Sequence, residues 1–316
     1  MNKPLRQIMV PLDGSAFAEQ ALPLAQFLAK QAEATLHLVH VRATNPVAYA
    51  EEEPMIDEKI NSHTQTHEQG YLTSVANQIQ QTADQSVKTI HLEGVPGSVL
   101  AEYAVDTEID LIVMTTHGRG GLARAWLGSV ADTLARVSSI PVLLLRPQHQ
   151  NEGDPSIAQA VSTPKKILIP LDGSVLAEDV LKPALTLATI LSAELRLVRV
   201  IPTFETSNFV PDLTKPDKDN TAEQRRAETA AYLEHVAEQL RSSGYTVQTR
   251  VLHAEQPATA ILEEVHAEAC DLIALSTHGR SGIKRLIIGS VADKVARAAD
   301  SPVLLYRPTT HTADHS

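Results

Sequence analysis

The chain has 316 residues, 43% hydrophobic and 21% charged, which is typical of a globular protein with room for two domains of about 150 residues. Its formal net charge of −11 argues against non-specific binding to nucleic acid, which needs basic surfaces that displace counterions from phosphates. Cys270 is the single cysteine, so an intramolecular disulfide is excluded, and no apolar run approaches a membrane span. We therefore expect a cytoplasmic protein with no membrane partner.

Short apolar runs in the first half predict five β-strands, at Ile8–Leu12, Leu36–Val41, Val87–Leu92, Leu111–Thr115 and Val142–Leu145. The runs are nearly continuous rather than alternating, as expected for parallel strands buried on both faces. Helical patterns separate them, and Pro23 and Pro183 lie inside two equivalent helical segments, where we expect a bend because proline removes a hydrogen bond. Strands that alternate with helices predict a doubly wound parallel sheet with right-handed crossovers.

The second half of the chain repeats the first. Ile8–Ser15 recurs as Ile167–Ser174, and aligning residues 115–147 with residues 276–308 gives 19 identities in 33 positions. The sequence therefore predicts two α/β domains, at residues 1–147 and 164–308, each with a five-stranded parallel sheet flanked by helices. Residues 148–163 are polar and lack a sustained period, which indicates a linker, and residues 309–316 form a C-terminal tail.

Open parallel sheets bind ligands beyond the carboxyl ends of their strands, where the strand order reverses. The residues at this place after the first strand of each half are Pro11, Leu12 and Asp13, and Pro170, Leu171 and Asp172. Asp13 is placed to accept hydrogen bonds from a nucleoside. A structural alternative is equally compatible with the sequence: Asp13 makes an Asx-turn and Ser15 caps the first helix.

A glycine-containing segment follows the fourth strand of each half and leads into the last helix. Its glycines are Gly118 and Gly128, the latter followed by Ser129, and in the second half Gly279 and Gly289, the latter followed by Ser290. Phosphate binding needs converging N–H groups that no Cβ shields, best at the positive end of a helix. The alternative is that the glycines only end a strand and start a helix, with Ser129 as N-cap. Recurrence in both halves favours phosphate binding.

At this point the sequence resembles a known family. His117-Gly118-Arg119, Gly128-Ser129-Val130-Ala131-Asp132 and Pro141-Val142-Leu143-Leu144 are similar to the C-terminal signature of the universal stress protein family, and all three strings recur in the second half. The resemblance covers nearly the whole chain apart from the linker and the last residues. It implies a tandem protein with a Rossmann-like, adenine nucleotide alpha hydrolase-like fold and strand order 3-2-1-4-5 in each half.

The ATP-binding branch of that family carries Gly-x2-Gly-x9-Gly-Ser/Thr, and here Thr115 and Ser276 replace the first glycine. The resemblance implies that Asp13 and Asp172 contact the adenine or ribose of ATP. It also implies an adenine pocket lined by Val41 and Val200, with Met114 and Leu275 nearby, and phosphates, bound with Mg²⁺, at Gly128, Ser129 and Val130 and at Gly289, Ser290 and Val291.

The function implied is that of a stress-response protein that binds ATP and acts as a sensor or signalling module. A nucleotide-free dimerisation scaffold and a slow ATP hydrolase are the alternatives. A hydrolase is less favoured, because His117 and His278 have no adjacent carboxylate or nucleophile in sequence. P-loop and dinucleotide fingerprints are absent. Glu255, near a possible phosphate path, predicts weaker binding in the second half.

The last strand of each half, Val142–Leu145 or Val303–Tyr306, would lie at a sheet edge in the family's strand order. An uncovered apolar edge is an aggregation hazard, so these edges need a partner. Both strands follow a proline and end in Arg-Pro, a similarity that permits two-fold antiparallel pairing. We expect the two domains to form a pseudo-dimer through these strands, with further homodimerisation of the whole chain left open.

Overall fold

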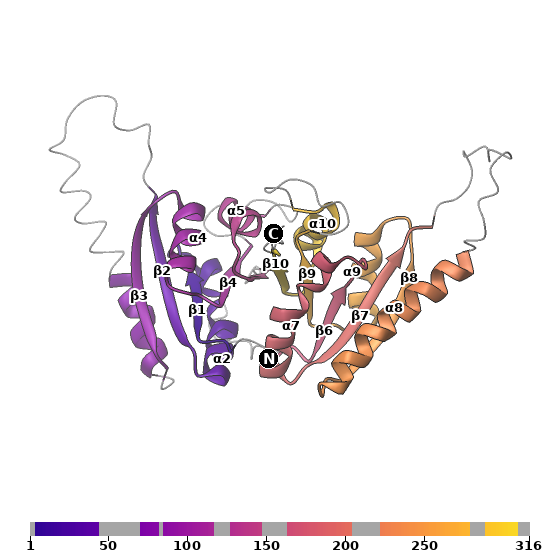
Figure 1. The fold of residues 1–316 in the computed structure, drawn as a ribbon. Coiled ribbons are helices and arrows are strands. Elements are labelled where there is room, and N and C mark those ends of the chain that lie inside the picture. The colour runs from indigo at the N-terminus through magenta and orange to yellow at the C-terminus, as the bar shows by residue number, and fades with distance from the viewer. Residues whose placement is uncertain are drawn as a thin grey trace, which may run out of the picture.

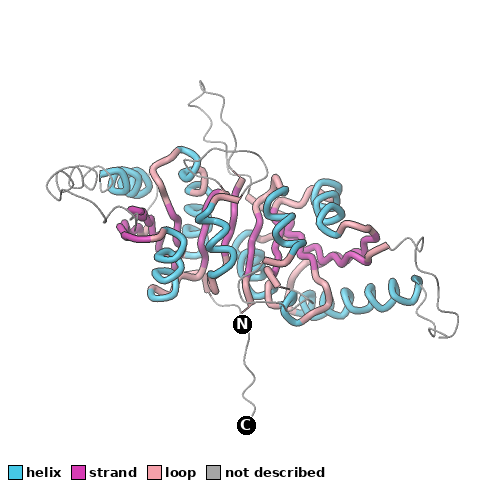
Figure 2. Tube along the Cα trace, turned by 90° about the horizontal axis from the view of Figure 1, so that it is seen from above, coloured by secondary structure: helices cyan, strands magenta, loops and turns pink. Residues whose placement is uncertain are grey.

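The computed structural model describes residues 4–43, 70–81, 85–116, 127–146, 163–203, 222–278 and 288–308. These residues form a ten-stranded sheet with helices on both faces (Figures 1 and 2). The strands are β1 (Gln7–Pro11), β2 (Thr35–Ala43), β3 (Val87–Gly94), β4 (Leu111–Thr115), β5 (Val142–Leu145), β6 (Lys166–Pro170), β7 (Glu194–Ile201), β8 (Val247–His253), β9 (Leu272–Ser276) and β10 (Val303–Tyr306). Each strand predicted in the first half is confirmed, with ends that differ from the prediction by at most two residues.

The helices lie in two layers, one on each face of the sheet. One layer holds α1 (Ala16–Glu19), α2 (Leu22–Ala32), the helical residues 70–81, α6 (Val175–Glu178), α7 (Leu181–Leu191) and α8 (Ala222–Ser242). The other holds α4 (Pro96–Asp106), α5 (Ser129–Val137), α9 (Pro257–Ala267) and α10 (Ser290–Ala298). The expected helical layers on a doubly wound sheet are therefore present.

The strand order is β3-β2-β1-β4-β5-β10-β9-β6-β7-β8, so β3 and β8 lie at opposite ends (Figure 1). Within each half the strands are parallel and follow the expected 3-2-1-4-5 order. At the centre β5 and β10 pair in antiparallel fashion, with Leu304 opposite Leu143. The expected pairing of the last strands is confirmed, and it joins the two predicted five-stranded sheets into one continuous sheet.

The expected bend at the prolines is a break between two helices. Pro23 lies at the start of α2, and Pro183 is the third residue of α7. In the first turn of a helix the N–H that proline lacks has no intrahelical partner, so the residue costs little there. The short helices α1 and α6 end before the break, and each begins at a serine whose side chain accepts a backbone N–H.

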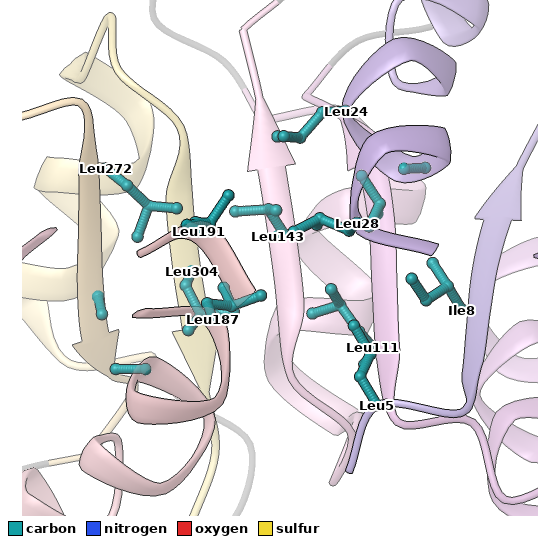
Figure 3. Close-up of a cluster of buried hydrophobic side chains, with 14 of the residues drawn as sticks. Leu5, Ile8, Leu24, Leu28, Leu111, Leu143, Leu187, Leu191, Leu272 and Leu304 are labelled. Atoms are coloured by element: carbon teal, nitrogen blue, oxygen red, sulfur yellow. The ribbon is translucent and has the colours of Figure 1, made fainter. Parts of the chain in front are cut away.

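Apolar side chains from the two halves share their cores. Leu28 of α2, Leu143 of β5, Leu187 and Leu191 of α7 and Leu304 of β10 belong to one buried cluster (Figure 3). A second cluster covers the opposite face, and it too includes residues of both halves. Because burial of apolar area drives folding, the two halves stabilise each other directly.

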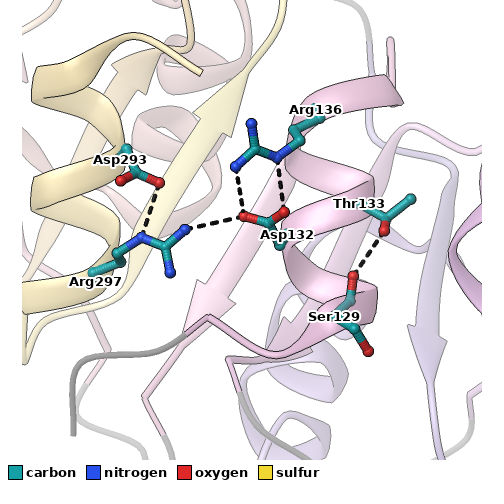
Figure 4. A network of polar contacts seen from close by, with 6 residues as sticks. All are labelled: Ser129, Asp132, Thr133, Arg136, Asp293 and Arg297. Atoms are coloured by element: carbon teal, nitrogen blue, oxygen red, sulfur yellow. Dashed lines mark hydrogen bonds and ion pairs between the residues drawn. The ribbon is translucent and has the colours of Figure 1, made fainter. Parts of the chain in front are cut away.

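A polar network connects α5 and α10 across the junction of the halves (Figure 4). Arg136 donates to Asp132 at 2.7 and 3.0 Å, and Arg297 donates to Asp293 at 2.9 Å and to Asp132 at 3.1 Å. The hydrogen bond from Arg136, together with the charges of both arginines, holds the pKa of Asp132 below its usual range. The carboxylate of Asp132 therefore stays ionised and accepts hydrogen bonds from both arginines.

The Arg-Pro ends of the last strands reach across the same junction. Arg146 donates to the carbonyl oxygens of Ala298 and Ala299, both at 3.3 Å, where α10 ends. Arg307 donates to the carbonyls of Arg136 and Val137, at 2.9 and 3.2 Å, where α5 ends. The last carbonyls of a helix have no intrahelical partner and carry partial negative charge, so each arginine caps a helix of the other half.

His37 is a buried histidine in the core of the first half, and its side chain is 2% exposed. Its Nε2 donates to Gln7 Oε1 at 2.6 Å, and its Nδ1 accepts the Tyr103 hydroxyl at 2.7 Å, which a neutral imidazole satisfies on both sides. Burial first, and then the charge of Lys88, lower the pKa of His37 from 6.5 to about 4.

This histidine predicts an acid-sensitive fold. Between pH 6.5 and about 4 the unfolded chain binds a proton at His37 that the folded chain does not, so the free energy of unfolding falls as the pH falls through that window. The loss should reach up to about 3 kcal/mol. Urea unfolding at the two ends of the window should show a smaller pH-dependent loss in His37→Gln than in the wild type. His253→Gln, at an exposed histidine, is the control, and equal losses in all three proteins would contradict the prediction.

Candidate functional site

A cleft of about 320 Å³ opens in the second half, at the carboxyl ends of β6 and β9 and the N-terminus of α10. Because β6 has β7 on one side and β9 on the other, the cleft lies where the strand order reverses. Its walls are Pro170, Leu171, Asp172, Ala177, Val200, Pro257, Ile261, Leu275, Ser276, Thr277, His278, Gly289, Ser290, Val291 and Ala292. The volume is in the range of small-molecule sites.

Every residue that the sequence predicts for the second site lines this cleft, with one exception. Gly279 lies outside the described residues, as do His117 and Gly118 of the first half. Residues far apart in the chain are thus brought together: the end of the first strand, the second strand, the fourth strand and the start of the last helix. The ends of the first and fourth strands and the start of the last helix were expected here from the switch point of a parallel sheet, whereas Val200 and Leu275 were expected from the family resemblance.

Asp172 serves a structural role while it lines the cleft. Its Oδ1 accepts the backbone N–H of Ser174 at 2.9 Å and the Ser174 hydroxyl at 2.6 Å, which makes an Asx-turn. Ser174 Oγ in turn accepts the N–H of Ala177 at 3.2 Å and caps α6. Gly173, between them, has φ +85°, the left-handed conformation that favours glycine. The structural alternative is therefore correct, and it fixes Asp172 in the wall of the cleft.

The start of α10 brings backbone N–H groups to the cleft. Gly289 is the N-cap residue and no side chain caps the helix, so the alternative of a serine cap is wrong for Ser290, as it is for Ser129 in α5. A Cβ on Gly289 would lie 3.3 Å from the carbonyl oxygen of Thr277, whose backbone accepts the Gly289 N–H at 2.8 Å. Glycine at this position therefore permits the close approach of the two segments. The first N–H groups of a helix have no intrahelical partner and attract anions.

Ser276, which stands in place of the first family glycine, holds the chain after β9. Its hydroxyl donates to the carbonyl oxygen of His278 at 2.7 Å. Thr277, next in sequence, is 1% exposed, and its hydroxyl lies 3.0 Å from His278 Nδ1. The hydroxyl of Ser276 therefore orders the segment that leads into the glycine loop.

The first half repeats this arrangement where it is described. Asp13 Oδ1 accepts the N–H and the hydroxyl of Ser15 at 2.9 and 2.6 Å, and the Gly128 N–H donates to Thr116 O at 2.7 Å. The other predicted residues of this half occupy the equivalent ends of strands and helix: Pro11 in β1 and Leu12 after it, Val41 in β2, Met114 and Thr115 in β4, and Ser129 and Val130 in α5.

Charge around the second cleft is sparse. Among the described lining residues, Asp172 is the one carboxylate and His278 the one side chain that can carry a positive charge. Glu255 is exposed and lies two residues before Pro257, outside the lining set, so the expected weakening of this site by Glu255 stays a prediction. An anion would be bound here chiefly by backbone N–H groups.

Several lining residues escaped the sequence argument. Pro257 and Ile261 come from α9, Ala177 comes from α6, and Ala292 comes from the first turn of α10, while Thr277 follows β9. Ile261 and Leu275 give the cleft an apolar wall beside Val200. The amphipathic pattern of α9 could have identified Ile261 as facing the sheet, although not as lining a cleft.

A sequence model of the universal stress protein family matches residues 4–146 and matches again at residues 163–307. The chain belongs to the universal stress protein family. The two matches show two such domains in tandem, as the internal repeat predicted. Among the described residues, the helices lack the combined length and apolar character that crossing a membrane requires.

Two relatives match over most of this chain. A universal stress protein of Synechocystis is 24% identical over 324 residues, covering 96% of this chain and 100% of the relative. One of Mycobacterium tuberculosis is 28% identical over 222 residues, 70% of this chain and 69% of the relative. The crystal structure of a universal stress protein from Archaeoglobus fulgidus has a TM-score of 0.67 and 20% identity, covering 96% of this chain and 99% of that one. That likeness shows the fold.

Proposed function

We propose that this universal stress protein binds ATP in clefts at the carboxyl ends of its strands and acts as a stress-response sensor or signalling module. The observation that carries the proposal is the convergence in one cleft of an apolar wall, a fixed carboxylate and an uncapped helix N-terminus. These three features match the three parts of a nucleotide: a flat apolar base, a sugar with hydroxyl donors and a polyanionic phosphate chain.

Each part of ATP has a place in the proposed arrangement. Adenine would lie against Val200, Ile261 and Leu275, and the sugar hydroxyls would reach the carboxylate of Asp172. The phosphates would accept hydrogen bonds from the backbone N–H groups of Ser290 and the residues beside it, at the positive end of the helix dipole. Any Mg²⁺ would be bound chiefly by the phosphate oxygens, since the one lining carboxylate lies at the proposed sugar end.

Binding is proposed rather than catalysis. Hydrolysis of ATP needs a group that positions or activates a water beside the terminal phosphate. Among the described lining residues at the start of α10, none is a carboxylate, and His278 belongs to the loop that Ser276 orders. A nucleotide-free scaffold is the competing function, and the pairing of β5 with β10 supports it, because the backbone hydrogen bonds of these two strands join the halves.

The domain boundaries, the cellular location and the assembly of the whole chain are also proposed. We place the domain boundaries at residues 1–147 and 164–308, with a linker at 148–163 whose residues before 163 lie outside the described part of the chain. The protein would act in the cytoplasm. A further dimer of the whole chain would use surfaces other than β5 and β10, which are already paired with each other.

The test is binding of ATP by the full-length wild type. Calorimetry with ATP and Mg²⁺ should show saturable binding, with up to two sites per chain and weaker binding of GTP. Mass spectrometry of gently purified protein should detect retained adenine nucleotide. No binding at millimolar ATP would contradict the proposal and favour the scaffold, whereas steady release of phosphate would favour the slow hydrolase.

A further inference from the structure

The turn that presents Asp172 to the cleft is supported from behind by Arg199. A Cβ added to Gly173 would lie 2.6 Å from Nη1 and 2.9 Å from Cζ of Arg199, so the guanidinium packs directly on the turn. Arg199 precedes Val200 in β7, and successive residues of a strand point to opposite faces. Val200 lines the cleft, and the arginine therefore supports the turn from the other face of the sheet.

A second group of contacts holds the guanidinium in place. Arg199 Cζ lies 5.1 Å from the centroid of the Tyr232 ring in α8, a cation–π distance. The Tyr232 hydroxyl donates to Glu178 Oε1 at 2.8 Å, and Glu178 is the last residue of α6, the helix that the Asp172 turn caps. The contacts thus form a closed ring from the turn through α6, Tyr232 and Arg199 back to the turn.

The charges of this group act on one another. Burial first, and then the hydrogen bond with Glu178, raise the pKa of Tyr232, while the charge of Arg199 opposes that shift and the charge of Asp172 adds to it. Arg199 and Asp172 are therefore both close enough to Tyr232 for their opposite charges to affect its pKa. A cation behind the turn offsets a carboxylate that would otherwise repel an incoming polyanion.

The first half has the same turn with a different support. The N–H of Leu12 donates to Val39 O and that of Leu171 to Val198 O, each at 2.8 Å, so His40 corresponds to Arg199. The imidazole Nδ1 of His40 donates to the carbonyl oxygen of Leu12 at 2.8 Å, because that oxygen can only accept. The Tyr–Glu pair is retained, as Tyr71 donates to Glu19 at 2.9 Å. In the described residues, the turn is thus supported by an imidazole in the first half and by a guanidinium in the second.

We propose that Arg199 is a positioning residue of the second cleft, which fixes the turn that presents the Asp172 carboxylate to a nucleoside and offsets its charge as the phosphates enter. This inference rests on the proposed function. It goes beyond that function by assigning a role to a residue that does not line the cleft. The two clefts of one chain would then hold the nucleoside end of their ligands by different means, a guanidinium in one and an imidazole in the other.

The test uses adenosine, which has the nucleoside end alone, beside ATP. Methyl NMR of the full-length protein separates the sites, because Ile261 reports the second cleft and Met114 the first. Arg199→Gln should weaken adenosine at the second cleft about fivefold, weaken ATP there by more because the charge of Asp172 is then no longer offset, and leave the first cleft unchanged. Arg199→Lys keeps the charge but lacks the planar group that stacks on Tyr232, so it should recover part of the loss.

A double-mutant cycle separates positioning from general stability. Asp172→Asn keeps the Oδ1 acceptor of the turn and removes the charge, so Arg199→Gln should cost less affinity on that background. Arg241→Gln is the control, since Arg241 donates to the Val247 carbonyl from α8 and is remote from the turn. Unchanged adenosine affinity in Arg199→Gln, or strictly additive effects in the cycle, would overturn the inference while the proposed function stands. Wild-type protein that binds neither adenosine nor ATP would overturn both.

Discussion

Replacing Leu304 with aspartate should cost the protein most of its stability. Leu304 is fully buried in β10, lies opposite Leu143 of β5, and packs in the cluster shared by the two halves (Figure 3). The substitution removes apolar burial worth about 2 to 5 kcal/mol and places a carboxylate among the buried leucines of that cluster. Since the folded state of a typical domain is stable by about 5 to 15 kcal/mol, the loss should be severe.

Urea unfolding and binding of an apolar dye would measure this effect, because separated halves expose their shared core. Val175→Asp makes the same chemical change at a residue that is 79% exposed, and it should leave the unfolding midpoint nearly unchanged. A milder variant with Arg146→Ala and Arg307→Ala removes the helix caps across the junction while keeping the core intact. It should loosen the halves without unfolding them. Native stability in Leu304→Asp would contradict the shared core.

The pairing of the halves could be predicted from the sequence because the family resemblance supplied the strand order and general rules supplied the rest. Val142–Leu145 and Val303–Tyr306 are apolar, similar, and at the edge of the expected strand order, and an apolar edge needs a partner. The targets of Arg146 and Arg307 could not be predicted. The Arg-Pro repeats were visible, but the carbonyls they cap belong to the other half, and only the register of β5 with β10 brings them within reach.

The helix break before Pro23 is a second feature that the sequence alone could not predict. The same local sequence is compatible with a proline inside one long helix and with a proline in the first turn of a new helix. Which of the two forms depends on whether the preceding residues can begin a helix of their own. Here Ser15 caps α1, which ends at Glu19, and α2 then starts beside the proline. In the cleft, residues that follow β-strands were predicted because strand order places them, whereas Ile261 and Pro257 depend on how α9 packs on the sheet.

Gly289→Asp should abolish ATP binding in the second cleft and yet be at least as stable as Gly289→Ala, which places the same Cβ beside Thr277 O. Gly289 is the N-cap of α10 with no side-chain cap, and it has φ −57°, which any residue adopts. Aspartate is a favoured N-cap, and its charge is stabilising at a helix N-terminus, so it should contribute about 0.5 to 1 kcal/mol to stability. The same carboxylate would occupy the place proposed for the phosphates and repel them.

Comparison with Gly289→Ala distinguishes a lost site from a lost fold. Affinity for ATP at the second cleft should fall at least about a hundredfold, a cost of about 2.7 kcal/mol, while the urea midpoint is no lower than that of Gly289→Ala. Gly289→Ala is the matched control: its Cβ lies 3.3 Å from Thr277 O, which requires a shift of only a few tenths of an ångström, and it adds no charge. Gly128→Asp should act in the same way on the first site, since Gly128 is the equivalent N-cap of α5. If Gly289→Asp folds normally and still binds ATP with wild-type affinity at the second cleft, the phosphates do not lie at the start of α10.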